Sequence, residues 1–199
     1  MNVVILKYNA GNVFSVQCAL KRIGVEASIT DDPALITAAD KVIFPGVGEA
    51  STAMDYLRQR GLDTLIKGLK QPVLGICIGM QLLCRSSAEG NTSCIGVFDA
   101  DVKRFDSSLS PVSKIPHMGW NTIKVVGGDR RVFDSGCDGR YVYFVHSYYA
   151  PVGRHTVAQC QYITPFSAAM QRDNFYATQF HPEKSGSIGE LILKKFIEL

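Results

Sequence analysis

Residues 72–83 read PVLGICIGMQLL. The apolar run 72–76 predicts a buried strand, and residues 79–85 predict a helix. Glycines stand two residues before and two residues after Cys77. Small residues at this spacing are typical of a sharp turn from a strand into a helix, because neighbouring backbone comes close to such a turn. The stretch therefore predicts a nucleophile-elbow geometry with Cys77 at its tip.

Short apolar runs alternate with helical patterns through the first half of the chain. Strands are predicted at 2–8, 26–30 and 41–46, and helices at 13–24, 31–40, 49–61 and 62–70. This alternation predicts a parallel sheet with helices on both faces, and ligands of such sheets bind at the carboxyl ends of the strands. Three of these ends carry polar or glycine-rich breaks: YNAGN (8–12), PGVGE (45–49) and GICIG (75–79).

The second half contains strand-like runs that follow one another with turn signals between them. They span 96–105, 121–126, 141–149, 156–162, 168–172 and 175–180. We interpret them as hairpins that extend the sheet, with one strand returning to its centre. Residues 187–199 predict an amphipathic helix with Ser185 or Ser187 as its N-cap. No linker or repeat interrupts the chain, so we expect residues 1–199 to form one α/β domain.

The composition is that of an ordinary globular protein, with a net charge of +3 and with acidic and basic residues mixed along the chain. It gives no reason to expect a nucleic acid or a membrane as a partner. No apolar run reaches the ~18 residues of a membrane span, and the N-terminus lacks the features of a signal peptide. We therefore expect a cytoplasmic protein. The spacing of its six cysteines suggests no metal site, and most are expected to be small core residues.

Cys77 has two features that favour reactivity. The start of a helix stabilises negative charge, and a thiolate is the reactive form of cysteine. The backbone N–H group of the next residue, Ile78, could point at an oxyanion. The alternative is a structural cysteine between two packing glycines. A nucleophile would also need a base and a group that orients the base.

A base and an orienting group are available in the stretch QFHPEKSG, residues 179–186. His181 and Glu183 are two residues apart, and Pro182 favours extended geometry, so both side chains can face the same side. Glu183 can then hold one ring nitrogen of His181 while the other nitrogen faces the Cys77 sulfur. The alternative is a turn with solvated charges. The other histidines are weaker candidates for the base: His117, His146 and His155.

A second glycine-rich break, FPGVGEA (44–50), leads from a predicted strand into a predicted helix. Gly46 and Gly48 allow a turn that directs backbone N–H groups outward. Such a loop could bind a phosphate, complete an oxyanion hole or be a plain turn. The chain has no P-loop lysine nearby, and a thiol follows on the next strand, so we favour the oxyanion hole.

The motifs PGVG, GICIGMQLL and QFHPEKS, in this order and at these separations, resemble the class I (triad) glutamine amidotransferases. The resemblance implies a flavodoxin-like α/β fold, with a doubly wound, mostly parallel sheet, helices on both faces and antiparallel hairpins in the second half. It also implies hydrolysis of glutamine to glutamate and ammonia. Cys77 would be the nucleophile, His181 the base and then the acid, and Glu183 the residue that orients His181.

The same resemblance implies further site residues and no cofactor or metal. The oxyanion would be stabilised by the backbone N–H groups of Val47 and Ile78. The glutamine would be held by six residues: Gly46, Gly48, Gln81, His146, Ser147 and Tyr148. The first loop has Lys7 and Tyr8 where relatives often carry an acidic and a small residue, which leaves the triad untouched.

The stretches IPHMGWN (115–121) and YVYFVHSYY (141–149) resemble the glutaminase subunits of imidazole glycerol phosphate synthases, which act in histidine biosynthesis. This resemblance implies a heterodimer with a (β/α)8 cyclase subunit. Ammonia would pass through a channel to the cyclase, which makes imidazole glycerol phosphate and aminoimidazole carboxamide ribotide. Four residues would face the cyclase: Asn12, Trp120, Tyr143 and Lys184. For Trp120 the alternative is packing in the core.

Three other functions remain open at this point. The first is a glutaminase for the synthesis of pyridoxal phosphate, anthranilate or guanylate, although the stretch PHMGWN argues against it. The second is a cysteine hydrolase or thiol chaperone on a flavodoxin-like frame. The third is a binding module without enzymatic activity.

Overall fold

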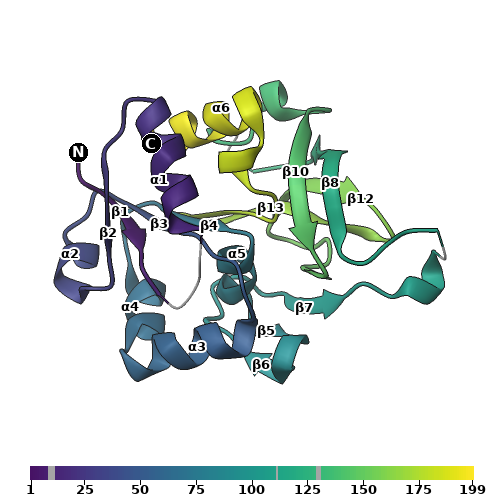
Figure 1. The fold of residues 1–199 in the computed structure, drawn as a ribbon, viewed down its shortest axis with the longest axis horizontal. Helices are drawn as coiled ribbons and strands as arrows, with labels where there is room; N and C mark the ends of the chain where they lie inside the picture. Colours follow the sequence, from purple (N-terminus) through teal and green to yellow (C-terminus); the bar gives the residue numbers. More distant parts are fainter. Residues whose placement is uncertain (9–11, 111, 129–130) are drawn as a thin grey trace.

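The structure is a computed structural model that describes residues 1–8, 12–110, 112–128 and 131–199. Its centre is an eight-stranded sheet in the order β2-β1-β3-β4-β14-β13-β12-β9 (Figure 1). The first five strands in this order pair in parallel and the last three are antiparallel. The parallel order is that of flavodoxin-like doubly wound sheets, so the predicted fold class is confirmed. The strands are β1 (Val3–Leu6), β2 (Ala27–Thr30), β3 (Lys41–Phe44), β4 (Val73–Ile76), β9 (Lys124–Val125), β12 (Thr156–Gln161), β13 (Pro165–Arg172) and β14 (Phe175–Thr178).

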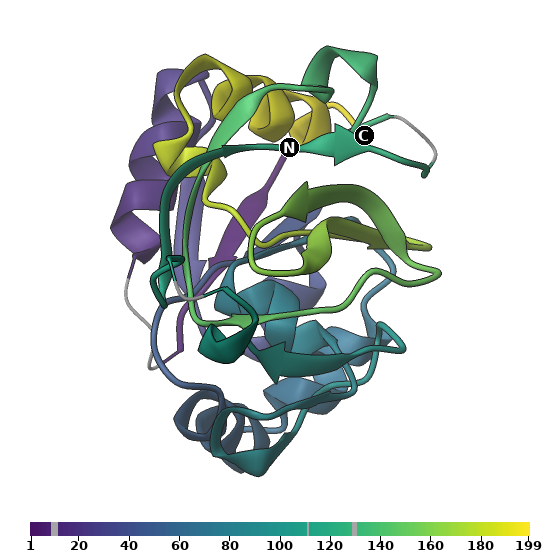
Figure 2. The same cartoon turned by 90° about the vertical axis from the view of Figure 1, so that its right-hand side faces the viewer.

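Helices cover both faces of the parallel part of the sheet (Figures 1 and 2). One face packs against α1 (Val13–Arg22) and α6 (Gly186–Ile197), and the other against α2 (Pro33–Thr37), α3 (Ala50–Gln59), α4 (Leu62–Gly68) and α5 (Ile78–Leu83). Side chains of β1 alternate between the two cores: Val3 and Ile5 lie in the first, Val4 and Leu6 in the second. Strands buried on both faces explain the near-continuous apolar runs in the sequence.

The second half is only partly as predicted. β14 returns to the centre of the sheet, between β4 and β13, as expected. Two smaller sheets stand apart from it: β8 (His117–Thr122) with β10 (Tyr141–His146), and β5 (Ser86–Ser87), β6 (Thr92–Ser93), β7 (Asp101–Arg104) and β11 (Tyr148–Tyr149). The prediction that all these strands extend the main sheet is therefore wrong.

The reason lies in the hairpin of β8 and β10, which packs across the main sheet (Figure 1). Val142 and Phe144 are fully buried in the core of the main sheet, whereas Trp120 and Tyr141 on the hairpin are exposed. The predicted strand 141–149 is divided because β10 pairs with β8 while β11 pairs with β7.

The remaining short elements are 3-10 turns, and one of them leads into the last helix. They are η1 (Glu89–Asn91), η2 (Ser107–Leu109), η3 (Ser135–Cys137) and η4 (Pro182–Lys184). Ser185 stands at the N-cap position of α6, but its side chain makes no capping bond there. In the described part of the chain, none of the helices is long and apolar enough to span a membrane.

The turn between β4 and α5 has the close packing that the glycines predict. Cys77 has φ 55° and ψ −109°, an unfavourable conformation for a residue with a side chain. A Cβ atom on Gly79 would lie 1.9 Å from the backbone oxygen of Phe44, and one on Gly75 would lie 2.8 Å from Leu83. Only glycine lets α5 approach β3 this closely, and this approach sets the position of Cys77.

We predict that Gly79→Ala destabilises the protein by about 3 kcal/mol, because the new methyl group meets backbone that cannot move aside cheaply. Chemical denaturation measures this free energy of unfolding. Gly68→Ala is the matched control, since a Cβ atom there has open space at the end of α4. A Gly79→Ala protein as stable as the control would contradict the packing described here.

Candidate active site

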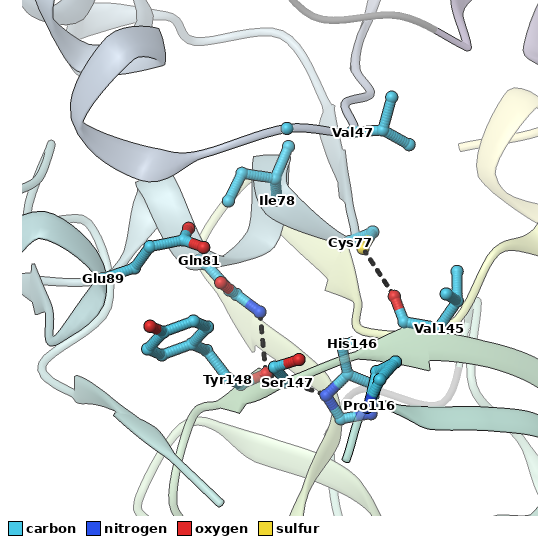
Figure 3. Close-up of a pocket in the computed structure, with 11 residues that line it drawn as sticks. Val47, Cys77, Ile78, Gln81, Glu89, Pro116, Val145, His146, Ser147 and Tyr148 are labelled. Atoms are coloured by element: carbon cyan, nitrogen blue, oxygen red, sulfur yellow. Dashed lines mark hydrogen bonds between the residues drawn. The ribbon is translucent and has the colours of Figure 1, made fainter.

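Loops from four adjacent parallel strands meet at one edge of the sheet. Tyr8 follows β1, Gly48 follows β3, Cys77 follows β4 and His181 follows β14. The carboxyl ends of parallel strands share an edge, and there a cavity of about 320 Å³ opens (Figure 3). Its lining residues are Val47, Gly48, Cys77, Ile78, Gln81, Glu89, Pro116, Val145, His146, Ser147 and Tyr148.

Cys77 is the nucleophile candidate in this cavity. Its backbone N–H group donates to the Thr178 oxygen at 2.7 Å, which ties the turn to β14. Its side chain points toward β10 (Figure 3), with Sγ 3.9 Å from the backbone oxygen of Val145. The side-chain nitrogen of Gln179 donates to the same sulfur at 3.7 Å. The sulfur is thus buried by protein on one side and faces the cavity on the other.

His181 and Glu183 form a buried pair behind Cys77. Nδ1 of His181 donates to Oε1 of Glu183 at 2.8 Å, and both side chains are fully buried. This bond leaves Nε2 as the ring nitrogen that can exchange a proton, and Nε2 has no hydrogen-bond partner among the described residues. Burial would lower the pKa of His181, but the negative charges of Cys77 and Glu183 outweigh it and raise the pKa above its usual value.

Folding thus joins His181 and Glu183 in one buried pair, and it places Cys77 and His181 at the ends of the paired strands β4 and β14, although about a hundred residues separate them in the chain. Asn12 adds a contact that the sequence did not predict. Its side-chain nitrogen donates to Oε1 of Glu183 at 2.5 Å. The carboxylate is thus held from two sides, by His181 and by the start of α1.

His117 and His146 form a second buried pair, under the floor of the cavity. Nδ1 of His146 donates to the Tyr148 oxygen at 2.8 Å, so its Nε2 must accept, and Nδ1 of His117 donates to it at 3.1 Å. Nε2 of His117 then accepts from Asn121 at 3.4 Å. Burial lowers the pKa of His117 to about 4 and that of His146 to about 3. Both rings are therefore neutral and fully bonded near neutral pH.

This chain of bonds limits how His146 could hold glutamine, which stays a prediction. His146 lines the cavity, but both of its ring nitrogens are used inside the protein. Its side chain therefore has no free nitrogen with which to hold glutamine. Among the described residues, no group of three or more His, Cys, Asp or Glu side chains could hold a metal ion.

In the glycine-rich loop after β3, some residues line the cavity and one packs inside the protein. Val47 and Gly48 line the cavity, and Gly48 has φ 122°, which favours glycine. Gly46 is buried and does not line it: a Cβ atom there would lie 2.0 Å from the Tyr8 hydroxyl and 2.2 Å from Ile78. Tyr8 donates to the Pro45 oxygen at 2.6 Å. Gly46 is thus required for close packing against Tyr8 and Ile78, and its contact with glutamine stays a prediction.

The four predicted interface residues are connected to the segment 181–184 by single contacts or by the chain itself. Asn12 contacts Glu183 directly, and the exposed Lys184 follows it in the chain. Tyr143 accepts the His181 backbone N–H group at 3.0 Å, and its ring packs edge-on against Trp120 at 5.9 Å. Trp120 is 55% exposed, which rules out the alternative that it packs in the core.

Sequence reasoning missed several residues around the cavity. Glu89, Pro116 and Val145 line it, and Gln179 contacts the sulfur from behind. Glu89 accepts the Ala50 backbone N–H group at 2.9 Å, and burial raises its pKa. Glu89 follows no motif, so nothing local in the sequence marked it. Gln179 stands in the stretch QFHPEKSG, but only the histidine and the glutamate there had a pattern that pointed to chemistry.

Comparison with known proteins agrees with this fold. The family model described as Glutamine amidotransferase class-I matches residues 6–199. The imidazole glycerol phosphate synthase subunit HisH of Bacteroides fragilis (strain YCH46) is 60% identical over 199 residues, and that of Escherichia coli (strain K12) is 50% identical over 200 residues; each match covers 100% of both chains.

A solved structure of a glutamine amidotransferase is similar in fold, with a TM-score of 0.74 at 19% identity over 99% of this chain and 98% of that one. The sequence matches and the shared fold show that the chain belongs to the class I glutamine amidotransferase family, in the group formed by the HisH subunits of imidazole glycerol phosphate synthase.

Proposed function

We propose that this protein is the glutaminase subunit of an imidazole glycerol phosphate synthase and hydrolyses glutamine to glutamate and ammonia. The observation that carries the proposal is the buried His181–Glu183 pair, which leaves Nε2 of His181 without a partner at the end of the strand that pairs with the one carrying Cys77 to the cavity. The identity of 50–60% to HisH subunits over full length supports the choice of this enzyme over other amidotransferases. Residues 1–199 act as one catalytic domain.

The first half of the proposed reaction forms a thioester. The thiol proton of Cys77 moves to Nε2 of His181, and the resulting thiolate attacks the side-chain carbonyl carbon of glutamine. The oxygen becomes negative and accepts hydrogen bonds from the backbone N–H groups of Val47 and Ile78. Ile78 is suited to this role as the first residue of α5, where a backbone N–H group has no partner within the helix.

The second half releases both products. The bond between carbon and nitrogen breaks, and His181 gives its proton to the departing ammonia. A water molecule then attacks the thioester, His181 accepts the proton of that water, and glutamate leaves as the Cys77 sulfur is freed. Glu183 keeps Nδ1 of His181 protonated and stabilises the positive ring in both halves.

The cavity offers groups that suit glutamine. The partly buried carboxylate of Glu89 can bind the α-ammonium group, which carries the opposite charge. The side-chain nitrogen of Gln81 donates to the Tyr148 oxygen and to Gln179. Its side-chain oxygen has no hydrogen bond to the described residues and could accept one from the substrate. Ser147, Tyr148 and Gly48 complete the lining around the substrate backbone.

The surface beside Glu183 is the proposed site of the (β/α)8 cyclase subunit. Free ammonia is largely protonated in neutral water and diffuses away, so it must pass directly into the synthase through an enclosed channel. Trp120 is an exposed aromatic anchor of the kind that dominates interfaces, and the ring of Tyr143 packs against it. Lys184 is exposed as well. Asn12 reaches from the same surface to the triad carboxylate.

In the heterodimer, the cyclase would use the ammonia to form imidazole glycerol phosphate and aminoimidazole carboxamide ribotide for histidine biosynthesis. We also propose that the enzyme acts in the cytoplasm. All six of its cysteines are free, which suits a reducing compartment.

The direct test mixes the chain with a HisF-type cyclase and measures glutamate release with and without the phosphoribosyl substrate of the cyclase. Cys77→Ala should lower the rate by at least about 1000-fold, because no other group forms the thioester. Cys18→Ala is the control, since Cys18 is exposed on α1 and away from the cavity. Glutamate release by Cys77→Ala at the rate of the control would refute the mechanism.

The pH dependence tests the role of Glu183. Its charge helps to hold the pKa of His181 above the usual value, so His181 keeps its proton to higher pH. Glu183→Gln removes that charge and lowers the pKa. The alkaline limb of kcat/KM should therefore move to lower pH. Glu26→Gln, an exposed change of the same kind, should leave the limb in place. An unmoved limb in Glu183→Gln would contradict this role.

A further inference from the structure

Gln179 is a buried polar residue that no part of the reaction above uses. It follows β14 directly, its side chain is fully buried, and its backbone N–H group donates to the Ala168 oxygen at 2.8 Å. The side chain reaches across to the tip of the elbow, where Nε2 lies 3.7 Å from the Cys77 sulfur. A buried amide group beside a reactive sulfur can act on it only through the atom that faces it.

The direction of that amide group is fixed by a backbone oxygen. The Tyr148 oxygen can only accept, so the Gln81 side chain must turn its nitrogen toward it, at 2.9 Å (Figure 3). The same nitrogen donates to Oε1 of Gln179 at 2.9 Å. Gln179 therefore presents its oxygen to Gln81 and its N–H group to the sulfur.

His146 reinforces this arrangement, because it donates to the same Tyr148 oxygen from the other side at 2.8 Å. The bonds continue from His146 through His117 to Asn121 on β8. Rotating the Gln179 amide would place its nitrogen against the nitrogen of Gln81, donor against donor in a buried site, which is costly. The N–H group is thus held toward the sulfur before any substrate binds.

We propose that Gln179 is a catalytic residue, whose side-chain N–H group hydrogen-bonds the Cys77 sulfur and stabilises it as the thiolate, with Gln81 as the positioning residue. The catalytic role of Gln179 rests on the proposed function, whereas the experiment that tests its bond to the sulfur does not. A donor stabilises the charged sulfur more than the neutral one, because hydrogen bonds to ionised groups are the stronger ones. The bond raises the share of Cys77 present as the attacking thiolate, and this gain exceeds the small loss of nucleophilicity of each thiolate.

The other groups that face the sulfur must be kept constant in a test. His181, after β14, and Tyr8, after β1, both interact electrostatically with Cys77. The Val145 oxygen on β10 is the remaining polar contact. Replacing Gln179 leaves all three in place, so a change in the ionisation of the sulfur would come from the amide.

The experiment measures alkylation of Cys77 by iodoacetamide as a function of pH, with the labelled peptide quantified by mass spectrometry. It needs neither glutamine nor the cyclase. Gln179→Met removes the donor at similar volume, and the midpoint of the pH profile should move about one unit to higher pH. Below both midpoints, alkylation of the variant should be about three- to tenfold slower, because a smaller fraction of Cys77 is thiolate. The loss is less than tenfold where the more basic thiolate is also more nucleophilic.

A second variant guards against a folding defect. Gln179→Glu keeps the acceptor for Gln81 but places an oxygen against the sulfur, so it should move the midpoint further than Gln179→Met does. Gln59→Met, exposed at the end of α3, is the matched control and should match the wild type. The exposed Cys18 serves as an internal reference in every sample, and thermal unfolding verifies that each variant is folded.

The outcomes separate this inference from the proposed function. Folded Gln179→Met and Gln179→Glu proteins with the wild-type midpoint would overturn the inference, even if glutamate release remains. A shifted midpoint in a chain that releases no glutamate with a cyclase would support the inference and refute the function. A purely structural role for Gln179 would lower thermal stability without moving the midpoint.

Discussion

The pairing of β4 with β14 is the interaction on which the site depends. β4 carries Cys77 at its end and β14 leads into His181, so the register of this one pair sets how the sulfur meets the ring. Thr178 pairs with Ile76, and the Thr178 oxygen then accepts the Cys77 backbone N–H group. A slip of one residue would turn the side chains to opposite faces of the sheet. Burial of both strands on both faces excludes such a slip.

A second layer of the site consists of buried polar groups bonded in sequence. The bonds run from His117 through His146 to the Tyr148 oxygen, and from there through Gln81 and Gln179 to the sulfur. The Tyr148 backbone oxygen can only accept, so Gln81 and His146 must both donate to it. This sets the direction of every other hydrogen bond in the series. Such a satisfied network specifies a unique arrangement, whereas a partly satisfied one would be costly in the protein interior. It links the hairpin at the proposed cyclase surface to the nucleophile.

The parallel sheet and the positions of Cys77, His181 and Glu183 could be predicted from the sequence, because turns and extended segments leave a local pattern of residues. The glycines around Cys77 and the spacing of His181 and Glu183 each reflect one turn or one extended segment. The separate sheets, the neutral pair that includes His146 and the roles of Glu89 and Gln179 could not be predicted. They arise from contacts between segments distant in the chain, and no local periodicity records which buried partner an amide or an imidazole will meet.

The most direct measurement of the central claim uses a glutamine analogue that carries a diazo-ketone group. This group occupies the position of the side-chain amide and alkylates a nucleophile placed to attack it. The account predicts one label per chain, located on Cys77 by peptide mapping, and slower labelling when glutamine is present. Labelling of the exposed Cys18 instead, or no labelling of a folded chain in complex with a cyclase, would contradict the assignment of Cys77 as the nucleophile of a glutamine site.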